Sequence, residues 1–184
     1  MARCVPKRRA EFVAGRTASR AALRQLGVQD QGISPGANRA PNWPDGLTGS
    51  ITHDSSHCLA AVARQQHVRS IGIDIERRQR MSKAVCDLFL STNDHSAMSG
   101  LSTLDPDDIP VTVFSAKESV FKALNPLTGA LGDPHDFYVR FSGEPGIFTA
   151  HLSQDNTGLG IVGRYFVDRE RVITCAALLA ISAA

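Results

Sequence analysis

Two acidic residues two positions apart, Asp74 and Glu76, are the first candidates for chemistry in this sequence. Residues 70–76 alternate apolar and polar side chains, which is typical of a strand with one buried face. The three isoleucines of this stretch would share the buried face, and the two carboxylates would share the other, about 7 Å apart along the strand. Two carboxylates this close repel each other, and a cation would relieve them. Hard oxygen ligands of this kind suit Mg²⁺, which binds one or two carboxylates together with substrate phosphates.

The same pattern also fits an amphipathic edge strand with two solvated acids, and the residues alone leave both interpretations open. Gly72 would lie on the face of the carboxylates, where its missing side chain lets another group approach the backbone. Because clustered carboxylates repel each other, we expect the removal of Asp74 to stabilise the metal-free protein modestly.

A second pair of candidates, Glu118 and Lys122, is four residues apart in a stretch with helical periodicity. Residues 115–124 carry an apolar stripe, and the Asn-Pro dipeptide at 125–126 predicts the end of the helix. Glu118 and Lys122 would project from one face, where they could serve a metal ion and a phosphate or form an ordinary surface pair. Ser115 and Glu118 also fit a capping box at the start of the helix.

Basic residues crowd the first part of the chain, although the net charge of +2 does not indicate a nucleic-acid binder. Residues 7–26 are predicted to form a helix that ends near Gly27. Arg16, Arg20 and Arg24 recur every four residues and would share one face of it. Such a face suits an anionic small ligand or an acidic partner, and it also fits a solvated surface.

The composition is that of a globular protein, with 42% hydrophobic and 21% charged residues. None of the four cysteines belongs to a CxxC motif, which argues against structural zinc and a redox motif. No signal peptide is recognisable, and the longest apolar run, residues 175–181, is too short to span a membrane. We therefore expect a cytoplasmic protein with reduced thiols and no membrane span.

Turn residues and periodicity predict the remaining elements. A loop with the single tryptophan, Trp43, is expected over residues 29–49, and a short strand over 49–53 ends in His53. The strand at 59–64 is predicted to form a hairpin with 70–76. A short helix is expected at 83–90, a polar loop at 91–110, and strands near 136–141, 147–152, 160–167 and 172–181. The pattern predicts an α+β fold with two α+β halves.

At this point the sequence resembles the 4′-phosphopantetheinyl transferases. The residues GIDIE at 72–76 and FSAKESVFK at 114–122 resemble the paired signature of that family. Three upstream motifs are similar to the subgroup that contains the enterobactin synthetase component D: RAEFVAGR at 9–16, RAPNWPDG at 39–46 and GSITH at 49–53. Because these motifs occur in order across residues 9–122, the resemblance is specific there, and from residue 127 onward it is only general.

The family transfers the phosphopantetheine arm of coenzyme A to a serine of an apo acyl or peptidyl carrier protein, and releases adenosine 3′,5′-bisphosphate. The resemblance therefore implies a monomeric, Mg²⁺-dependent holo-carrier synthase that acts for siderophore, other secondary-metabolite or fatty acid synthases. It implies one domain, 1–184, made of two similar α/β lobes related by a pseudo-twofold axis, with the active site between them. The lobes would cover about residues 1–80 and 81–184.

The resemblance also assigns roles to residues. The positions that match the Mg²⁺ ligands are Asp74, Glu76 and Glu118. Glu118 also matches the residue proposed to help deprotonate the carrier serine, and it forms the expected catalytic set with Lys122 and Asp74. The implied contacts with coenzyme A are Arg16, Arg39, Thr52, His53, Lys117 and Lys122.

Two departures from the family pattern accompany the resemblance. Members of the subgroup usually have a further N-terminal segment, so we expect that the N-terminus is truncated. Residues 90–95 lack the acidic residue expected soon after Leu-Ser, in a region that faces the carrier, which leaves the carrier preference open. A non-catalytic coenzyme A- or carrier-binding module and a metal-dependent phosphohydrolase are the alternatives to a transferase.

Overall fold

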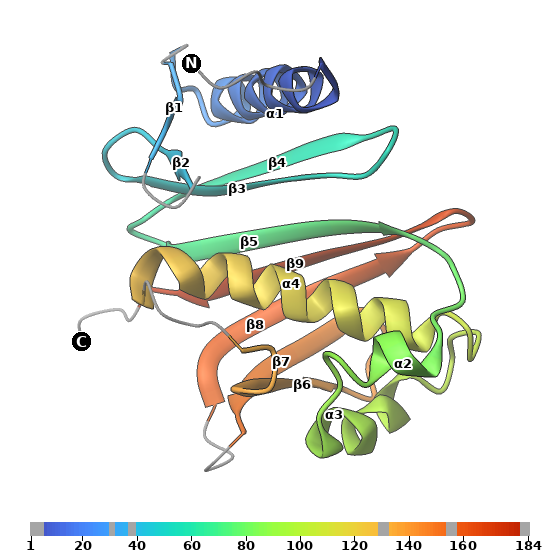
Figure 1. Cartoon of the computed structure of the whole chain (residues 1–184). Helices are drawn as coiled ribbons and strands as arrows, with labels where there is room; N and C mark the ends of the chain where they lie inside the picture. The colour runs from blue at the N-terminus through green and yellow to red at the C-terminus, as the bar shows by residue number, and fades with distance from the viewer. Residues whose placement is uncertain (1–5, 30–31, 37–39, 129–132, 154–157, 181–184) are drawn as a thin grey trace.

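A computed structural model describes residues 6–29, 32–36, 40–128, 133–153 and 158–180. Helices and antiparallel sheets alternate along the chain, which confirms the predicted α+β class (Figure 1). The helices are α1 (Pro6–Gln25), α2 (Lys83–Cys86), α3 (Thr92–Ala97), the 3₁₀ helix η2 (Met98–Leu101) and α4 (Ile109–Thr128). The strands are β1 (Ser34–Pro35), β2 (Pro41–Asn42), β3 (Leu47–His53), β4 (Cys58–Arg64), β5 (Val68–Arg77), β6 (Phe137–Phe141), β7 (Ile147–Leu152), β8 (Gly158–Val167) and β9 (Arg171–Leu179).

The N-terminal part consists of α1 packed on the antiparallel β3–β4 hairpin (Figure 1). Leu23 of α1 is fully buried and packs with Ile33 and Leu47 in a small apolar cluster. The loop predicted over residues 29–49 also contains the short antiparallel pair β1–β2. The basic helix is therefore fixed over the strand that ends in His53.

The C-terminal part is a five-stranded antiparallel sheet in the order β5-β9-β8-β7-β6, with α4 across one face (Figure 1). The apolar residues of α4 recur at helical spacing and include Val113, Ala116 and Val120, all fully buried. They pack on sheet residues such as Phe148 and Ile161 in the main hydrophobic core. This core holds α4 at a fixed position over β5.

Gly72 is where α4 comes closest to β5. A Cβ atom at this position would overlap the carbonyl oxygen of Ser119, so only glycine fits. The predicted close approach at Gly72 is therefore confirmed, and the approaching group is the backbone of α4. Because Gly72, Asp74 and Glu76 share one face of β5, the side chains of Asp74 and Glu76 are also directed toward α4.

The predicted hairpin between residues 59–64 and 70–76 is wrong. β4 pairs with β3, and β5 pairs with β9, which lies about a hundred residues further along the chain. Alternation of side chains identifies a strand but does not identify its partner. Asp74 is opposite Thr174 of β9 in this pairing.

The predictions for residues 83–128 also need correction. The helix predicted at 83–90 is confined to α2, and the predicted polar loop at 91–110 contains α3, η2 and the start of α4. Pro110 lies in the first turn of α4, where its missing N–H leaves no hydrogen bond unmade. Pro126 does not end the helix, because the bond it removes belongs to the last turn. Ser115 lies inside α4, so it cannot cap the helix with Glu118.

No helix in these described ranges is long and apolar enough to cross a membrane.

Candidate functional site

The side chain of Asp74 is a hub that joins three elements. It is 3% exposed, and its Oδ1 accepts hydrogen bonds from Lys122 Nζ of α4, at 2.6 Å, and from Thr52 Oγ1 of β3, at 3.1 Å. Its Oδ2 accepts from Ser115 Oγ at 2.9 Å. β5 does lie at the edge of its sheet, but the interpretation of its acids as solvated is wrong for Asp74, which is buried and accepts hydrogen bonds at both carboxylate oxygens.

The helix α4 supplies two of the three partners of Asp74, Ser115 and Lys122, because of its register over β5. Ser115 and Lys122 are seven residues apart, which is two helical turns, so they lie along one stripe of the helix. Thr174 of β9 supports this arrangement, since its Oγ1 donates to the carbonyl oxygen of Ser115 at 2.7 Å and lies 3.0 Å from the hydroxyl oxygen of Ser115. Ser115 is thus a member of the site that its sequence pattern does not reveal.

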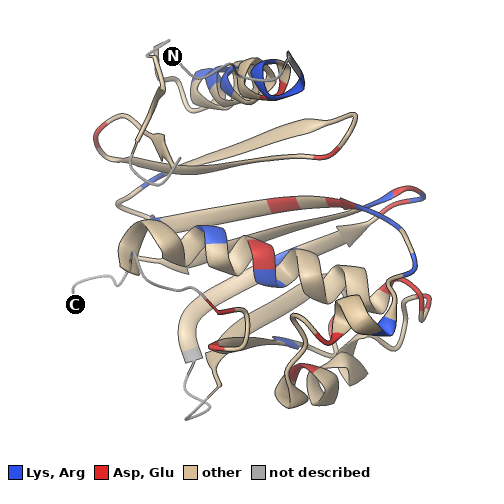
Figure 2. Cartoon of the chain, viewed as in Figure 1, with Lys and Arg blue, Asp and Glu red and all other residues tan. Residues whose placement is uncertain are grey.

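Glu76 and Glu118 lie close to this hub and are only partly buried. Burial, followed by the charge of Asp74, raises the pKa of Glu76 to about 7, against an opposing effect of Lys122. Burial is also the largest cause that raises the pKa of Glu118, with Lys122 lowering it and Asp74 raising it. Neither carboxylate has a hydrogen bond or an ion pair with another described residue. In Figure 2 the acidic positions of β5 lie next to α4, which carries both acidic and basic positions.

The three carboxylates provide the hard oxygen donors that Mg²⁺ prefers. As the side chains stand, no three candidate metal-ligating groups of the described residues come together closely enough to hold an ion. Lys122 occupies one oxygen of Asp74 and acts there as the counter-charge. Burial, with the charge of Asp74 as a smaller cause, raises the pKa values of Glu76 and Glu118 and so disfavours their charged forms, which a divalent cation would favour. The residues therefore fit the ion by their chemistry.

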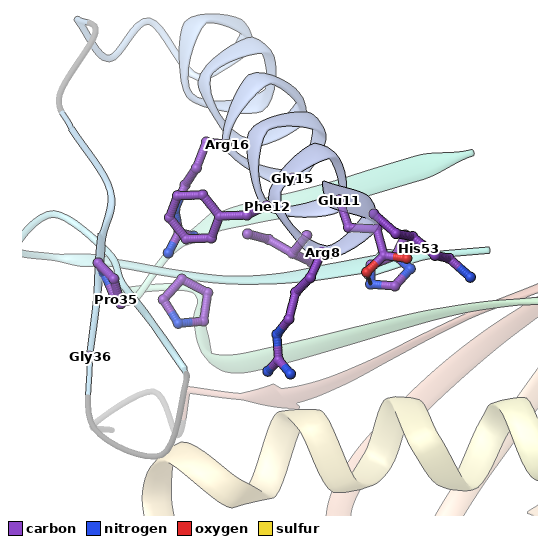
Figure 3. A pocket seen from close by; sticks show the side chains of 11 residues that line it. Arg8, Glu11, Phe12, Gly15, Arg16, Pro35, Gly36 and His53 are labelled. Carbon is purple, nitrogen blue, oxygen red and sulfur yellow. Dashed lines mark ion pairs between the residues drawn. The ribbon is translucent and has the colours of Figure 1, made fainter. Parts of the chain in front are cut away.

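A basic cavity of about 750 Å³ lies between α1, the β1–β2 segment and the end of β3 (Figure 3). Its basic lining residues are Lys7, Arg8, Arg16 and His53, and Glu11 is the acidic residue among the described residues of its wall. The pattern of side chains on a strand places His53 on the opposite side of β3 from Thr52. His53 Nε2 is 4.0 Å from Oε2 of Glu11.

Arg16 is the most enclosed of these basic side chains. Its guanidinium carbon lies 4.7 Å from the ring centroid of Phe12, and burial lowers its pKa. Its Nε is buried and has no hydrogen-bond partner among the residues with described positions. Arg20 lines a smaller neighbouring cavity, and Arg24 lines neither. Lys7 and Arg8 were not predicted as contacts, although Arg8 precedes Arg16 by about two helical turns, a spacing that places them near one face.

A second cavity, of about 150 Å³, adjoins Glu118 on the other side. Four phenylalanines form most of its wall: Phe89, Phe114, Phe121 and Phe137. Lys117 and Pro134 complete its lining. Glu118 is therefore between the charged hub and an aromatic cavity.

Lys117 is placed apart from the other predicted contacts. Its Nζ is bound inside the C-terminal part, 2.7 Å from Oδ2 of Asp94 and 2.9 Å from the carbonyl oxygen of Phe137. The side chains of Lys117 and Asp94 are 4% and 0% exposed. Asp94 also closes a capping box with Ser91, so the stretch at 90–95 does contain an acidic residue after Leu-Ser, contrary to the prediction. Arg39, another predicted contact, lies outside the described residues.

Comparison with known proteins places this geometry in a family. Residues 1–63 match the family model of the 4′-phosphopantetheinyl transferase N-terminal domain, and residues 70–175 match that of the 4′-phosphopantetheinyl transferase superfamily. The chain belongs to the 4′-phosphopantetheinyl transferase superfamily. The second match contains Asp74, Glu76, Glu118 and Lys122.

Three relatives illustrate the membership. The 4′-phosphopantetheinyl transferase Svp of Streptomyces mobaraensis is 37% identical over 187 residues, which cover 98% of this chain and 76% of Svp. The 4′-phosphopantetheinyl transferase PptT of Mycobacterium tuberculosis is 34% identical over 194 residues, covering 97% of this chain and 82% of PptT. Enterobactin synthase component D of Salmonella typhi is 40% identical over 123 residues, which cover 65% of this chain and 49% of component D. The predicted enzyme class, the transferase, and the relation to component D are confirmed.

Proposed function

We propose that this chain transfers the 4′-phosphopantetheine arm of coenzyme A to a serine of an apo carrier protein and releases adenosine 3′,5′-bisphosphate. The observation that carries the proposal is the hub at Asp74, where β3, β5 and α4 bring together a carboxylate, a lysine and two hydroxyls. Transfer of a phosphoryl-type group requires that the phosphates are held and their charge neutralised, with little covalent help from the protein. The hub and the neighbouring basic cavity supply groups of that kind.

The nucleotide part of coenzyme A fits the basic cavity under α1. Its phosphates would meet Arg16 and His53, which were predicted as contacts, and Arg8 from the same wall. The buried Nε of Arg16 offers a donor to a phosphate oxygen, and a charge-assisted bond of this kind is among the stronger hydrogen bonds. Arg39 and Thr52 stay proposed contacts on the strength of the family resemblance.

The pantetheine arm would extend past Glu118 into the aromatic cavity. The phenylalanines there offer apolar contacts to the arm, and the size of the cavity suits an extended chain better than a ring system. In this arrangement the phosphorus that bears the arm lies near Asp74 and Lys122. The reacting bond is thereby held between the two cavities.

In the proposed reaction the serine hydroxyl of the carrier attacks the phosphorus that bears the arm. A serine O–P bond forms while the bond from that phosphorus to the bridging pyrophosphate oxygen breaks, and the electron pair leaves on adenosine 3′,5′-bisphosphate. Glu118 accepts the hydroxyl proton, and its raised pKa makes this carboxylate a stronger base than an exposed glutamate. Lys122 places its ammonium group against the phosphates as they bind beside Asp74.

A Mg²⁺ ion held by Asp74, Glu76 and Glu118 would supply charge neutralisation at the pyrophosphate oxygens. This ligand set is part of the proposal, as is the dependence of the reaction on Mg²⁺. Glu76 is the ligand whose proton must be lost near neutral pH before the ion binds.

We further propose that residues 1–80 and 81–184 form two lobes of one domain with a pseudo-twofold relation and with the site between them. The packing of one long helix on an antiparallel sheet in each part supports this arrangement. We propose a monomer in the cytoplasm, consistent with the free thiols of Cys58, Cys86 and Cys175. The carrier would belong to a siderophore, another secondary-metabolite or a fatty acid synthase.

One assay tests the function. The protein is incubated with coenzyme A, Mg²⁺ and several apo carrier proteins, and each carrier is examined by mass spectrometry. A mass increase of one phosphopantetheine arm, at the carrier serine, is the expected result. Binding of coenzyme A without any mass increase would instead favour a non-catalytic module, and release of phosphopantetheine or phosphate without a carrier would favour a phosphohydrolase.

A further inference from the structure

Within the part of the chain that the structure describes, the β3–β4 hairpin forms no backbone ladder with the five-stranded sheet. Its position against β5 depends instead on side chains at alternate positions of β3 and just beyond it. Ser50 Oγ accepts from the backbone N–H of Ile73 at 3.1 Å, and Thr52 donates to Asp74. Asp54 is the third member of this row, because side chains two residues apart share one face.

Asp54 performs two tasks at the end of β3. Its Oδ1 closes the turn to β4 by accepting the backbone N–H groups of Ser56 and His57, both at 2.6 Å. Its Oδ2 accepts from Nε of Arg171 at 2.9 Å. The carboxylate is 5% exposed, and these bonds hold its pKa well below the usual value despite burial.

Arg171 reaches Asp54 from the turn between β8 and β9. A second aspartate, Asp168, closes that turn by accepting the N–H groups of Glu170 and Arg171, both at 2.7 Å. The Arg171 guanidinium also donates from Nη2 to Ser56 Oγ at 3.1 Å, and its side chain is 13% exposed. Two turns that lie 117 residues apart in the chain are thereby fixed to each other.

The connection continues to the remaining elements of the site. Arg78, two residues after Glu76, donates from Nη1 to the carbonyl oxygen of Asp168 at 3.0 Å and from Nε to Oδ1 of Asp108 at 2.8 Å. Asp108 directly precedes α4, which carries Glu118 and Lys122. A chain of ion pairs and hydrogen bonds therefore links the ends of β3 and β5 with the start of α4.

We propose that Arg171 is a positioning residue that, through Asp54, fixes His53 against the rest of the site and so sets the grip on the nucleotide phosphates. His53 directly precedes Asp54 and faces the basic cavity, so any shift of the Asp54 turn moves its ring. Among the contacts that Ser50, Thr52 and Asp54 make, the one from Asp54 to Arg171 is an ion pair and lies beside His53. The inference rests on the proposed function, because it takes the phosphates of coenzyme A as the ligand of His53.

The test measures the affinity for adenosine 3′,5′-bisphosphate by calorimetry. Arg171→Met is expected to weaken binding about tenfold, a size usual for coupling between two groups. In a His53→Ala background, Arg171→Met should weaken the affinity by less than about a further twofold, because Arg171 acts on the nucleotide through His53. Arg171→Lys, which keeps an ion pair but not the forked contact, should be intermediate. Arg169→Met, in the same turn but with an exposed side chain, is the matched control and should bind like wild type.

Thermal melting reports whether each variant is folded. If Arg171→Met does not fold, Asp54→Asn replaces it, since the amide oxygen can still close the turn while the charge is lost; it should show the same dependence on His53. Unchanged affinity, or the same loss with and without His53, would overturn the positioning role. No effect of His53→Ala would remove His53 as a phosphate contact and would overturn this inference alone. Absence of nucleotide binding by wild type would count against the proposed function as well, which the carrier mass assay tests separately.

Discussion

The ammonium group of Lys122 lies 2.6 Å from Oδ1 of Asp74, on the same oxygen that accepts the hydroxyl proton of Thr52. Lys122 thereby supplies the counter-charge of a buried carboxylate in the protein without ligands. Its side chain is 28% exposed, so the ammonium group can turn toward a phosphate without leaving the site. The pair consequently couples the stability of the fold to the occupancy of the site.

Asp74→Ala is expected to destabilise the metal-free protein by about 2–4 kcal/mol, since it leaves Ser115, Thr52 and Lys122 without their shared acceptor. This reverses the prediction from repulsion between carboxylates, because Asp74 is surrounded by donors rather than only by other acids. Urea unfolding in the presence of a chelator measures the change. A higher unfolding free energy for the variant would show that repulsion outweighs the hydrogen bonds.

Glu76 should make the stability of the metal-free protein depend on pH. Its pKa of about 7 exceeds the ordinary glutamate value of 4.5, so between these values the folded state holds a proton that the unfolded state has released. The contribution of Glu76 to the free energy of unfolding is fully present below about pH 4.5 and is lost as the pH rises through 7. Unfolding free energies of wild type should therefore fall, relative to those of Glu76→Gln, across this range. Parallel curves for the two proteins would contradict the raised pKa.

Arg16→Ala should weaken the binding of coenzyme A by about 1.5–3 kcal/mol, the loss of a hydrogen bond to a charged group. The matched control is Arg24→Ala, which removes the same charge from the same helix outside the basic cavity and should have little effect. Calorimetry at two salt concentrations separates the outcomes. Equal losses at both positions, strongly reduced by salt, would make the helix face a diffuse electrostatic patch.

Lys117→Met is expected to lower the free energy of unfolding by about 3–5 kcal/mol, because it leaves the buried Asp94 carboxylate without its cation. The affinity of the folded fraction for coenzyme A should change much less. Lys83→Met removes a lysine from an exposed pair with Asp87 and should change the stability little. A large loss of coenzyme A affinity with unchanged stability would restore the predicted role of Lys117 as a ligand contact.

Residue spacing was sufficient to predict β5, the helical character of α4 and the candidates Asp74, Glu76, Glu118 and Lys122. It could not predict where Lys117 points, because one residue along a helix is a rotation of about 100° and the partner Asp94 comes from another element. The pairing of β5 with β9 and the contact between Asp54 and Arg171 join residues about a hundred positions apart, so no local pattern encodes them. The capping box at Ser115 failed for the opposite reason: a local pattern was present, but the main core extends the helix past it.

The last prediction concerns Asp74 and Glu118 as parts of one site. If both hold the same Mg²⁺ ion, Asp74→Asn alone should remove most of the transferase activity, and adding Glu118→Gln should cost little more, because groups that act as a unit fail together. The conservative amides are preferred to alanine, since they limit the loss of stability expected at Asp74. Coenzyme A affinity should fall less than the rate, as the basic cavity is unchanged.

Thermal melting with and without Mg²⁺ gives a readout that does not depend on activity. Wild type should gain stability on addition of the ion, and each single variant should lose that gain. The control is Glu144→Gln, which changes a carboxylate outside the basic and aromatic cavities and should keep the stability gain on addition of Mg²⁺. The carboxylates would not share an ion if the activity loss of the double variant equalled the product of the two single losses and both single variants kept the Mg²⁺-dependent gain in melting temperature. Glu118 would then act as a base on its own, and Asp74 would serve chiefly to hold Lys122, Thr52 and Ser115 in place.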